Sequence, residues 1–284
     1  MNIKNVGIVG AGMMGSEIGL CFAMAGKTVI LNDIKPELAE NGKSKQETIL
    51  RKNVEKGKLT EEQKNQILSR VQTSADLADL KDCDLIIEAA AEIVDVKQSI
   101  FRTLDRECKK ETILASNTSS ISITKLAECL TEERKLNFSG MHYFSPASKM
   151  KLVEVIPTKF TSNETVQKIR AAAQEIGKDP ITVKDVPGFV VNRMLNIFFI
   201  EAIRLLEENV ASKEDIDKAC KLGLGHPVGP IELLDITGLD LNLYVHTILR
   251  EAYGDRFEPQ PLLKEMVEEG RLGKKVKHGF YDYE

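Results

Sequence analysis

The stretch VGIVGAGMMGSEIGLCFAMAGKTVILND, residues 6–33, decides the fold of this chain. It opens with a β-branched run, passes through a glycine-rich turn into a helical pattern, and closes with a second β-branched run. Its glycines follow the spacing GxGxxG, as Gly10, Gly12 and Gly15. In a strand–turn–helix unit they permit a tight turn, close approach of a pyrophosphate, and close packing of the helix on the strand. The stretch therefore predicts a dinucleotide-binding unit.

The acidic residue that ends the second run indicates which dinucleotide binds. Asp33 lies 23 residues after Gly10, where a carboxylate accepts hydrogen bonds from the adenosine ribose hydroxyls. A carboxylate there repels a 2′-phosphate, so NAD is favoured over NADP. Met13 and Met14, inside the motif, join the glycines as expected cofactor-binding residues. One alternative stays open on the motif alone: the glycines only close a turn, and Asp33 caps the next helix.

The same alternation continues outward from this unit. Short runs with strand character are separated by helical patterns, at Val6–Val9, Thr28–Asn32, Asp84–Glu88, Thr112–Ser116, Phe138–Tyr143 and Leu152–Ile156. Strands that alternate with helices form a mostly parallel sheet covered on both faces. We therefore expect an α/β fold in which a Rossmann-type, doubly wound sheet occupies residues 1–186.

The remainder, residues 187–284, is predicted to be an all-α domain. After Ile181 the strand signal disappears, and the helical stretch VPGFVVNRMLNIFFIEAIRLLEE follows at residues 186–208. Its apolar residues surround nearly the whole helix, which predicts burial against another domain or subunit. Ser212 has the pattern of a helix start, and Gly223 and Gly225 have the pattern of its end.

Composition argues against several classes of protein. The chain has 284 residues and a formal net charge of −4, so we expect no general attraction to nucleic acid. Its five cysteines are scattered, without a CxxC pair, which favours a reduced cytoplasmic location over a disulfide framework or a zinc site. No run of about 20 apolar residues is present, so no membrane span is expected. No metal-ligand cluster is visible, and no metal is expected.

Polar side chains follow two of the predicted strands, at the edge where parallel sheets bind ligands. Asn117 and Ser119 lie in ASNTSSISI, just past residue 116. His142 lies near the end of one run and Glu154 lies in the next, 12 residues later. A carboxylate that binds one imidazole nitrogen fixes the tautomer and makes the other nitrogen a better base. On local sequence alone, a histidine in an apolar strand is more often a buried core residue, and that alternative stays open.

Several uncommon motifs, in the same order and spacing, resemble the L-3-hydroxyacyl-CoA dehydrogenases, and most closely the bacterial 3-hydroxybutyryl-CoA dehydrogenases. They are GIVGAGMMGSEI, IIEAAAE, ASNTSSISIT, MHYFSPASKMKLVEVI, KDVPGFVVNR, LGLGHPVGPIELLDITGLD and the terminal GFYDY. Together they cover essentially the whole chain and are far more specific than a glycine motif.

The resemblance implies a role for each matching site residue. His142 resembles the catalytic acid/base and Glu154 its orienting partner, while Ser119 and Asn192 resemble the groups that hydrogen-bond the substrate oxygen. Further cofactor contacts of the family correspond to Glu92, Lys97 and Asn117.

The implied reaction is hydride transfer that interconverts acetoacetyl-CoA and (S)-3-hydroxybutyryl-CoA. The resemblance places it in butyrate or butanol fermentation or in short-chain fatty acid β-oxidation. It also implies a homodimer formed mainly through residues after about Val186.

A CoA thioester carries phosphates, which an acidic protein must bind locally. Residues 43–58 hold six basic and two acidic side chains, a local charge of +4. On a helix, Lys45, Lys52 and Lys56 fall within about 40° of one another and form one basic stripe. Lys52 and Lys56 also match positions that contact CoA in the family. A solvated helix face is the alternative.

Three residues depart from the family pattern. Ser145 stands where asparagine is usual, so a polar contact near the nicotinamide is expected to be shorter or water-mediated. Glu17 replaces a small residue in the cofactor helix, where it either faces solvent or weakens pyrophosphate binding. Lys277 replaces a glycine and leaves the conformation of its loop in doubt.

Other functions remain as alternatives. One group of two-domain dehydrogenases uses a lysine four residues before an asparagine of the interdomain helix, but here Gly188 precedes Asn192 at that spacing. A non-catalytic NAD-binding relative is expected to lose His142 or Glu154, and both are present. A related sugar-acid dehydrogenase, which retains the histidine and glutamate, has no need of the basic stripe.

Overall fold

The chain folds into two compact units, described here from a computed structural model of residues 3–284. The first unit extends to Asp185 and the second comprises Val186–Glu284. The division expected from the sequence lies one residue further along, after residue 186.

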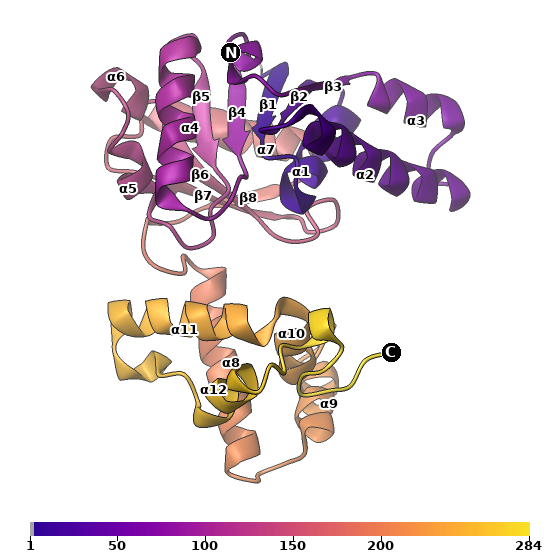
Figure 1. The fold of residues 1–284 in the computed structure, drawn as a ribbon, viewed down its shortest axis with the longest axis vertical. Coiled ribbons are helices and arrows are strands. Elements are labelled where there is room, and N and C mark those ends of the chain that lie inside the picture. The colour runs from indigo at the N-terminus through magenta and orange to yellow at the C-terminus, as the bar shows by residue number, and fades with distance from the viewer. Residues whose placement is uncertain (1–2) are drawn as a thin grey trace. The chain divides into compact units, whose positions relative to one another are not determined.

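The first unit is built on an eight-stranded sheet with the order β3-β2-β1-β4-β5-β6-β7-β8 (Figure 1). Strands β1 to β6 are parallel, β7 runs antiparallel to β6, and β8 pairs parallel with β7. The bounds are β1 Asn5–Val9, β2 Thr28–Asn32, β3 Val71–Ser74, β4 Leu85–Glu88, β5 Ile113–Ser116, β6 Phe138–Tyr143, β7 Leu152–Pro157 and β8 Asp179–Thr182. The order of the first six strands is that of a Rossmann fold, so the predicted fold class is confirmed.

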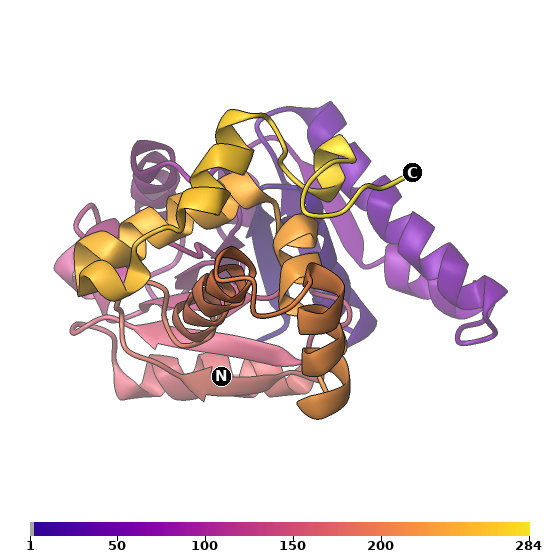
Figure 2. The ribbon, with the colours of Figure 1, turned by 90° about the horizontal axis from the view of Figure 1, so that it is seen from below.

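Helices cover both faces of this sheet. One core joins α1, α2 and α7 to the strands, whereas α4 packs on the other face, where Phe101 meets Phe138 edge-on at 4.9 Å. In Figure 1, α4 stands in front of the sheet and α7 lies behind it. The bounds are α1 Met13–Met24, α2 Pro36–Glu55, α3 Glu61–Leu68, η1 Leu77–Leu80, α4 Val94–Glu107, α5 Ile123–Ala127, α6 Glu132–Lys135 and α7 Asn163–Glu175. The pair α2 and α3 extends beyond the sheet in both views (Figures 1 and 2).

The six predicted strand runs correspond to β1, β2, β4, β5, β6 and β7. The edge strand β3 was not predicted, because only Val71 of its four residues is buried and the local pattern carries no alternation. The other edge strand, β8, forms where the strand signal ends, around Ile181.

The second unit is helical. Its elements are α8 Val191–Glu207, α9 Lys213–Gly223, α10 Pro230–Thr237, α11 Leu239–Tyr253, η2 Asp255–Phe257, α12 Pro261–Glu268 and η3 Lys274–Val276. The Ser212 hydroxyl accepts a hydrogen bond from the Asp215 N–H, so the predicted helix start is confirmed. The prediction that α8 is buried against another domain or subunit stays a prediction, because a partner subunit is not part of this structure. Phe199 and Ile203 are buried, but Met194 and Ile197 are exposed.

The carboxyl-terminal segment is fixed by a fully buried acid. Asp235 accepts hydrogen bonds from the N–H groups of Phe280 and Tyr281 and from the Tyr283 hydroxyl. Lys277 lies in the turn before this segment with a left-handed backbone, at φ 63°. The residue that departs from the family's glycine therefore adopts a conformation that glycine takes more readily.

Candidate active site

The glycine-rich turn between β1 and α1 has the geometry of a phosphate cradle. Gly10 has φ 98°, and a Cβ there would lie 2.6 Å from the Ala89 carbonyl oxygen. A Cβ on Gly15 would lie 1.8 Å from the Gly10 oxygen, whereas nothing lies within 4 Å of one on Gly12. Gly12 is the N-cap of helix α1 and offers no side-chain cap, so no side chain caps the first amides at the positive end of the helix dipole. Each glycine thus has the local geometry that the motif requires.

Asp33 is bound to this turn. One carboxylate oxygen accepts from the Ala11 N–H at 2.8 Å, and the other accepts from the Ile34 N–H at 2.8 Å. The N-cap of helix α2 is Lys35, so Asp33 does not cap this helix, and that part of the alternative is removed. Asp33 and Gly12 also line a cavity of about 670 Å³, whose apolar wall includes Ile34, Leu77 and Val96. The cavity offers an apolar surface beside a carboxylate, as an adenosine needs.

A buried ion pair organises the carboxyl ends of β4 and β5. Glu88 accepts from Lys97 Nζ at 2.7 Å, from the Ser116 hydroxyl at 2.6 Å and from the Ala90 N–H at 2.7 Å. Both charged side chains are almost completely buried. Lys97, predicted as a cofactor contact, therefore points into the protein and braces this edge of the sheet. Glu88 was not predicted as a site residue, although a carboxylate at the end of a buried strand is a signal for one.

Glu92 shapes the turn that follows β5. Its Oε1 accepts from the Thr118 hydroxyl at 2.5 Å, the Ser119 N–H at 3.1 Å and the Ser120 hydroxyl at 2.9 Å. Burial alone would raise the pKa of Glu92, but the Thr118 hydrogen bond and the Lys97 charge outweigh it and lower that pKa. Glu92 therefore stays ionised and holds Ser119, whose side chain is exposed at the edge of the sheet.

His142 and Glu154 lie side by side on adjacent strands. They are direct partners in the β6–β7 register, and Nδ1 of His142 lies 2.8 Å from Oε2 of Glu154. A carboxylate only accepts, so Nδ1 carries the proton and donates it. The Phe144 ring packs edge-on against the imidazole, with centroids 4.6 Å apart. Asn117 lies nearby in the sheet and accepts from the Tyr143 N–H at 2.9 Å.

The basic stripe runs along α2. Lys45, Lys52 and Lys56 are all exposed, with Lys56 directly after the last residue of the helix. Lys45 also lines a groove of about 690 Å³ between α1 and α2, together with Gly12 and Thr48. The groove and the adenosine-sized cavity share Gly12 and Asp33, so the stripe continues toward the glycine-rich turn.

Two of the departures from the family pattern involve the loop that follows His142, because Ser145 lies in it and Glu17 contacts it. Ser145 is exposed and precedes Pro146 through a cis peptide bond. Glu17 does not face solvent, so that expectation is wrong, but it lines the groove that also contains Gly12 and Met13, so an effect on pyrophosphate binding stays a prediction. Glu17 is buried and accepts two hydrogen bonds from Ser148.

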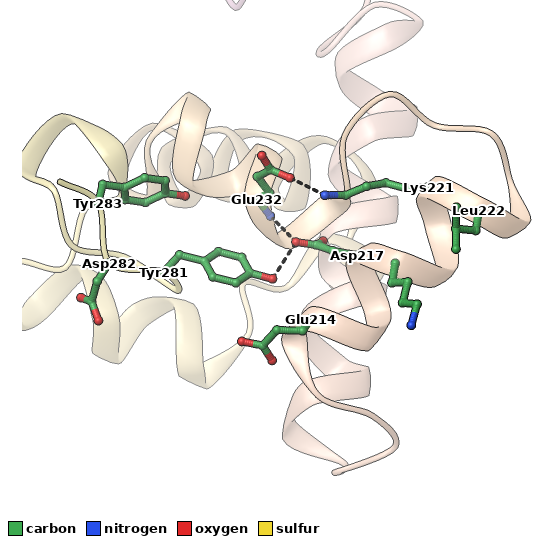
Figure 3. A pocket seen from close by; sticks show the side chains of 9 residues that line it. Glu214, Asp217, Lys221, Leu222, Glu232, Tyr281, Asp282 and Tyr283 are labelled. Carbon is green, nitrogen blue, oxygen red and sulfur yellow. Dashed lines mark hydrogen bonds and ion pairs between the residues drawn. The ribbon is translucent and has the colours of Figure 1, made fainter.

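The last predicted site residue belongs to the second unit. Asn192 lies in the first turn of α8, half-buried, and its carbonyl accepts from the Asn196 side chain at 2.7 Å. The same unit holds a cavity of about 540 Å³ that none of the predicted site residues lines (Figure 3). There the Tyr281 hydroxyl donates to Asp217, and Lys221 pairs with Glu232.

Residues 3–284 contain neither a candidate metal centre nor a helix that could span a membrane. No group of three or more histidine, cysteine, aspartate or glutamate side chains is arranged to hold a metal ion there. In the same part of the chain, no helix is both long and apolar enough to cross a membrane.

Comparison with known proteins identifies the family. The profile of the 3-hydroxyacyl-CoA dehydrogenase NAD binding domain matches residues 5–186, and that of the C-terminal domain matches residues 188–283. The chain is 44% identical over 285 residues to a probable 3-hydroxybutyryl-CoA dehydrogenase of Bacillus subtilis, covering 100% of this chain and 99% of the relative. It is 43% identical over 277 residues to the 3-hydroxybutyryl-CoA dehydrogenase of Clostridioides difficile, covering 97% and 98%.

A solved structure agrees with these relatives. The crystal structure of (S)-3-hydroxybutyryl-CoA dehydrogenase from Ralstonia eutropha superposes with a TM-score of 0.95 at 43% identity, covering 100% of both chains. The two family profiles together extend over both units. The chain is therefore an NAD-dependent enzyme of the 3-hydroxyacyl-CoA dehydrogenase family.

Proposed function

We propose that this enzyme interconverts acetoacetyl-CoA and (S)-3-hydroxybutyryl-CoA, with His142 as the acid/base and Glu154 as its orienting partner. The observation that carries the proposal is the 2.8 Å contact between these two side chains on β6 and β7. Residue His142 lies near the carboxyl end of β6, and β6 is parallel to β1, which leads into the glycine-rich turn. The acid/base therefore belongs to the edge of the sheet that receives NAD.

The chain's own groups account for proton transfer. Glu154 holds the Nδ1 proton of His142, so we assign the exchange of a proton with the substrate oxygen to Nε2. During reduction Nε2 donates to the oxygen of the 3-carbonyl, and during oxidation it takes the hydroxyl proton. Bound NADH supplies the hydride for the carbonyl carbon. In both directions the His142 ring alternates between imidazole and imidazolium, and the carboxylate of Glu154 stabilises the imidazolium.

Substrate oxygen binding is assigned to Ser119 and Asn192. Ser119 is exposed at the end of β5, and its backbone is fixed by Glu92. Asn192 brings a side-chain amide from α8 of the second unit. Donors placed where an alkoxide develops lower the barrier by a few kcal/mol each.

Cofactor binding is assigned to the glycine-rich turn and the residues around it. Gly10, Gly12, Met13, Met14 and Gly15 hold the pyrophosphate, and Asp33 accepts from the adenosine ribose. Asn117, whose amide oxygen already binds the Tyr143 N–H, and Glu92 contribute on the nicotinamide side. Lys97 acts through Glu88 and Glu92, because its ammonium is buried between them.

The CoA phosphates are assigned to the basic stripe, with Lys52 and Lys56 as direct contacts. The exposed position of both lysines supports this, as does the adjoining groove between α1 and α2. A sugar-acid dehydrogenase of the same fold is the second candidate, since it uses the same histidine and glutamate. The stripe favours the CoA thioester, because a small acid leaves these charges without a ligand.

We also infer a homodimer formed through the second unit and a cytoplasmic location. Large apolar side chains are exposed on the second unit, among them Met194, Val210, Leu222, Leu224 and Tyr244. Sedimentation velocity of the purified protein measures the mass directly, and a monomer at micromolar concentration contradicts the dimer.

The function is tested by following NADH consumption with acetoacetyl-CoA, and in parallel with free acetoacetate and with NADPH. We expect rapid turnover only for NADH with the thioester. Equal rates with free acetoacetate contradict the role of the stripe. Absence of turnover, with NADH still bound, contradicts the assigned reaction and favours the sugar-acid alternative.

A further inference from the structure

One buried carboxylate in α1 has no part in the chemistry above. Only 9% of Glu17 is exposed, and its buried neighbours in the helix are small or apolar. Burying a carboxylate is costly unless hydrogen-bond donors surround it. Here Oε2 accepts from the Ser148 N–H at 2.9 Å and from the Ser148 hydroxyl at 2.8 Å. Glu17 therefore binds α1 to the loop that joins β6 and β7.

The same loop is held by a buried ammonium. Lys178, just before β8, donates to the carbonyl oxygens of Ala147 at 2.5 Å and Met150 at 2.8 Å. Cys21, one turn after Glu17, lies with Sγ 3.6 Å from the Ala147 oxygen. Two opposite charges, Glu17 and Lys178, thus bind residues between 147 and 150 of the loop. This arrangement satisfies the loop's N–H and C=O groups and restricts its movement.

The loop starts next to the acid/base. Phe144, its first residue, packs against the imidazole of His142, and Ser148 lies four residues further on. At the other end of the contact, Glu17 lies one helical turn after Met13, where α1 leaves the glycine-rich turn. The Glu17–Ser148 contact therefore joins the helix that begins the cofactor site to the loop that covers His142.

We propose that Glu17 is a positioning residue, which fixes the loop 144–150 and, through Phe144, the placement of His142 relative to the cofactor turn. The proposal rests on the proposed function. Glu17 lines the groove beside Gly12, but the hydrogen bonds of its carboxylate go to Ser148, so we expect its loss to act mainly on the alignment of the chemical step. Misalignment of His142 weakens stabilisation of the transition state and so lowers kcat. The contacts that bind the cofactor and substrate in the ground state are kept, so KM stays nearly unchanged.

The test compares Glu17→Ala and Glu17→Gln with a matched control. Asp105→Ala removes another part-buried carboxylate, which holds the turn at Thr131 and the Arg134 guanidinium on the same unit, away from His142. We expect Glu17→Ala to lower kcat about tenfold, with KM for NADH and acetoacetyl-CoA changed less than about twofold. Glu17→Gln keeps an acceptor for Ser148 and recovers most of kcat. Asp105→Ala lowers stability and keeps the wild-type kcat.

Amide hydrogen exchange of residues 144–150 gives a readout that is independent of turnover. We expect faster exchange there in Glu17→Ala and unchanged exchange in Asp105→Ala. Wild-type kcat in Glu17→Ala, or unchanged exchange of the loop, overturns the proposal. A failure of the proposed function is recognised separately, because the unmodified enzyme then does not oxidise NADH with acetoacetyl-CoA. The predicted effect on kcat fails in that case. Amide hydrogen exchange still decides whether Glu17 holds the loop.

Discussion

Glu154 lies directly opposite His142 across the antiparallel pair β6–β7, and its Oε2 is 2.8 Å from the imidazole Nδ1. Because the two residues are register partners, their separation is set by the sheet and does not depend on a flexible loop. Both side chains are buried, so solvent screens the contact only weakly. The sheet itself thus orients the imidazole.

Replacing Glu154 with glutamine is expected to lower kcat by about 100- to 10,000-fold. The amide keeps the shape of the side chain but removes the charge that stabilises the imidazolium, and its NH₂ group favours the wrong tautomer. Steady-state kinetics with acetoacetyl-CoA measure the loss. Ser139→Ala, which removes a buried hydroxyl from the neighbouring strand β6, serves as the control and keeps kcat. A Glu154→Gln enzyme as fast as this control contradicts the orienting role.

Asp33→Asn is expected to raise the preference for NADPH over NADH at least tenfold, or about 1.4 kcal/mol. The neutral amide no longer repels a 2′-phosphate, and its oxygen still accepts from the Ala11 N–H. The ratio of kcat/KM for the two cofactors is the measurement. Asp84→Asn, the same change at the opposite end of β1, leaves the ratio unaltered. An unchanged ratio in Asp33→Asn shows that another group discriminates the cofactors.

The double substitution of Lys52 and Lys56 by glutamine is expected to raise KM for acetoacetyl-CoA about tenfold, or about 1.4 kcal/mol. The loss of two exposed cations weakens phosphate binding, so KM also becomes less sensitive to salt. The KM for NADH and kcat stay near their wild-type values. Lys43→Gln, about 160° away from Lys45 around the same helix, controls for loss of charge. If Lys43→Gln raises KM for acetoacetyl-CoA as much as the double substitution does, the basic stripe is only a solvated helix face.

His246 predicts a pH dependence of stability in the second unit. It is fully buried in α11, and within residues 3–284 no hydrogen-bond partner is found for either ring nitrogen. Burial lowers its pKa to about 4. An unfolded histidine has a pKa of about 6.5, so between these values the unfolded chain binds the extra proton and stability falls as the pH drops. Above about pH 6.5 His246 is neutral in both the folded and the unfolded chain, so its protonation no longer lowers the free energy of unfolding.

Urea unfolding at several pH values tests this assignment. The contribution of His246 at pH 5 is about 2 kcal/mol less favourable than at pH 8. His246→Leu is expected to lose that part of the pH dependence, whereas the exposed His226→Gln keeps it. If both variants retain the wild-type dependence, the acid sensitivity arises elsewhere.

Much of the fold was predictable because it is encoded locally. The spacing of Gly10, Gly12 and Gly15 and the two flanking β-branched runs specify one strand–turn–helix–strand unit, and the structure contains it. The pairing of His142 with Glu154 was also accessible, because two consecutive strands with a short connection lie next to each other.

Other features depend on contacts between distant segments. Strand β3 has a single buried residue, so it forms because β2 offers an edge for pairing. Lys97 points into the protein because it pairs with the buried Glu88. No short sequence motif links these two residues, so the pair could not be predicted. Glu17 and Ser148 are 131 residues apart, and nothing in either local sequence indicates the contact. Asp185, which binds Ser122 and the start of α5, is another such residue.

The most direct test of the account is the kcat of His142→Gln for NADH oxidation with acetoacetyl-CoA, measured beside the affinity for NADH by fluorescence. We expect kcat to fall by about 100- to 10,000-fold, while NADH binds as it does to the wild-type enzyme. A kcat within a few-fold of wild type, with NADH bound normally, would contradict the role of His142 as the acid/base.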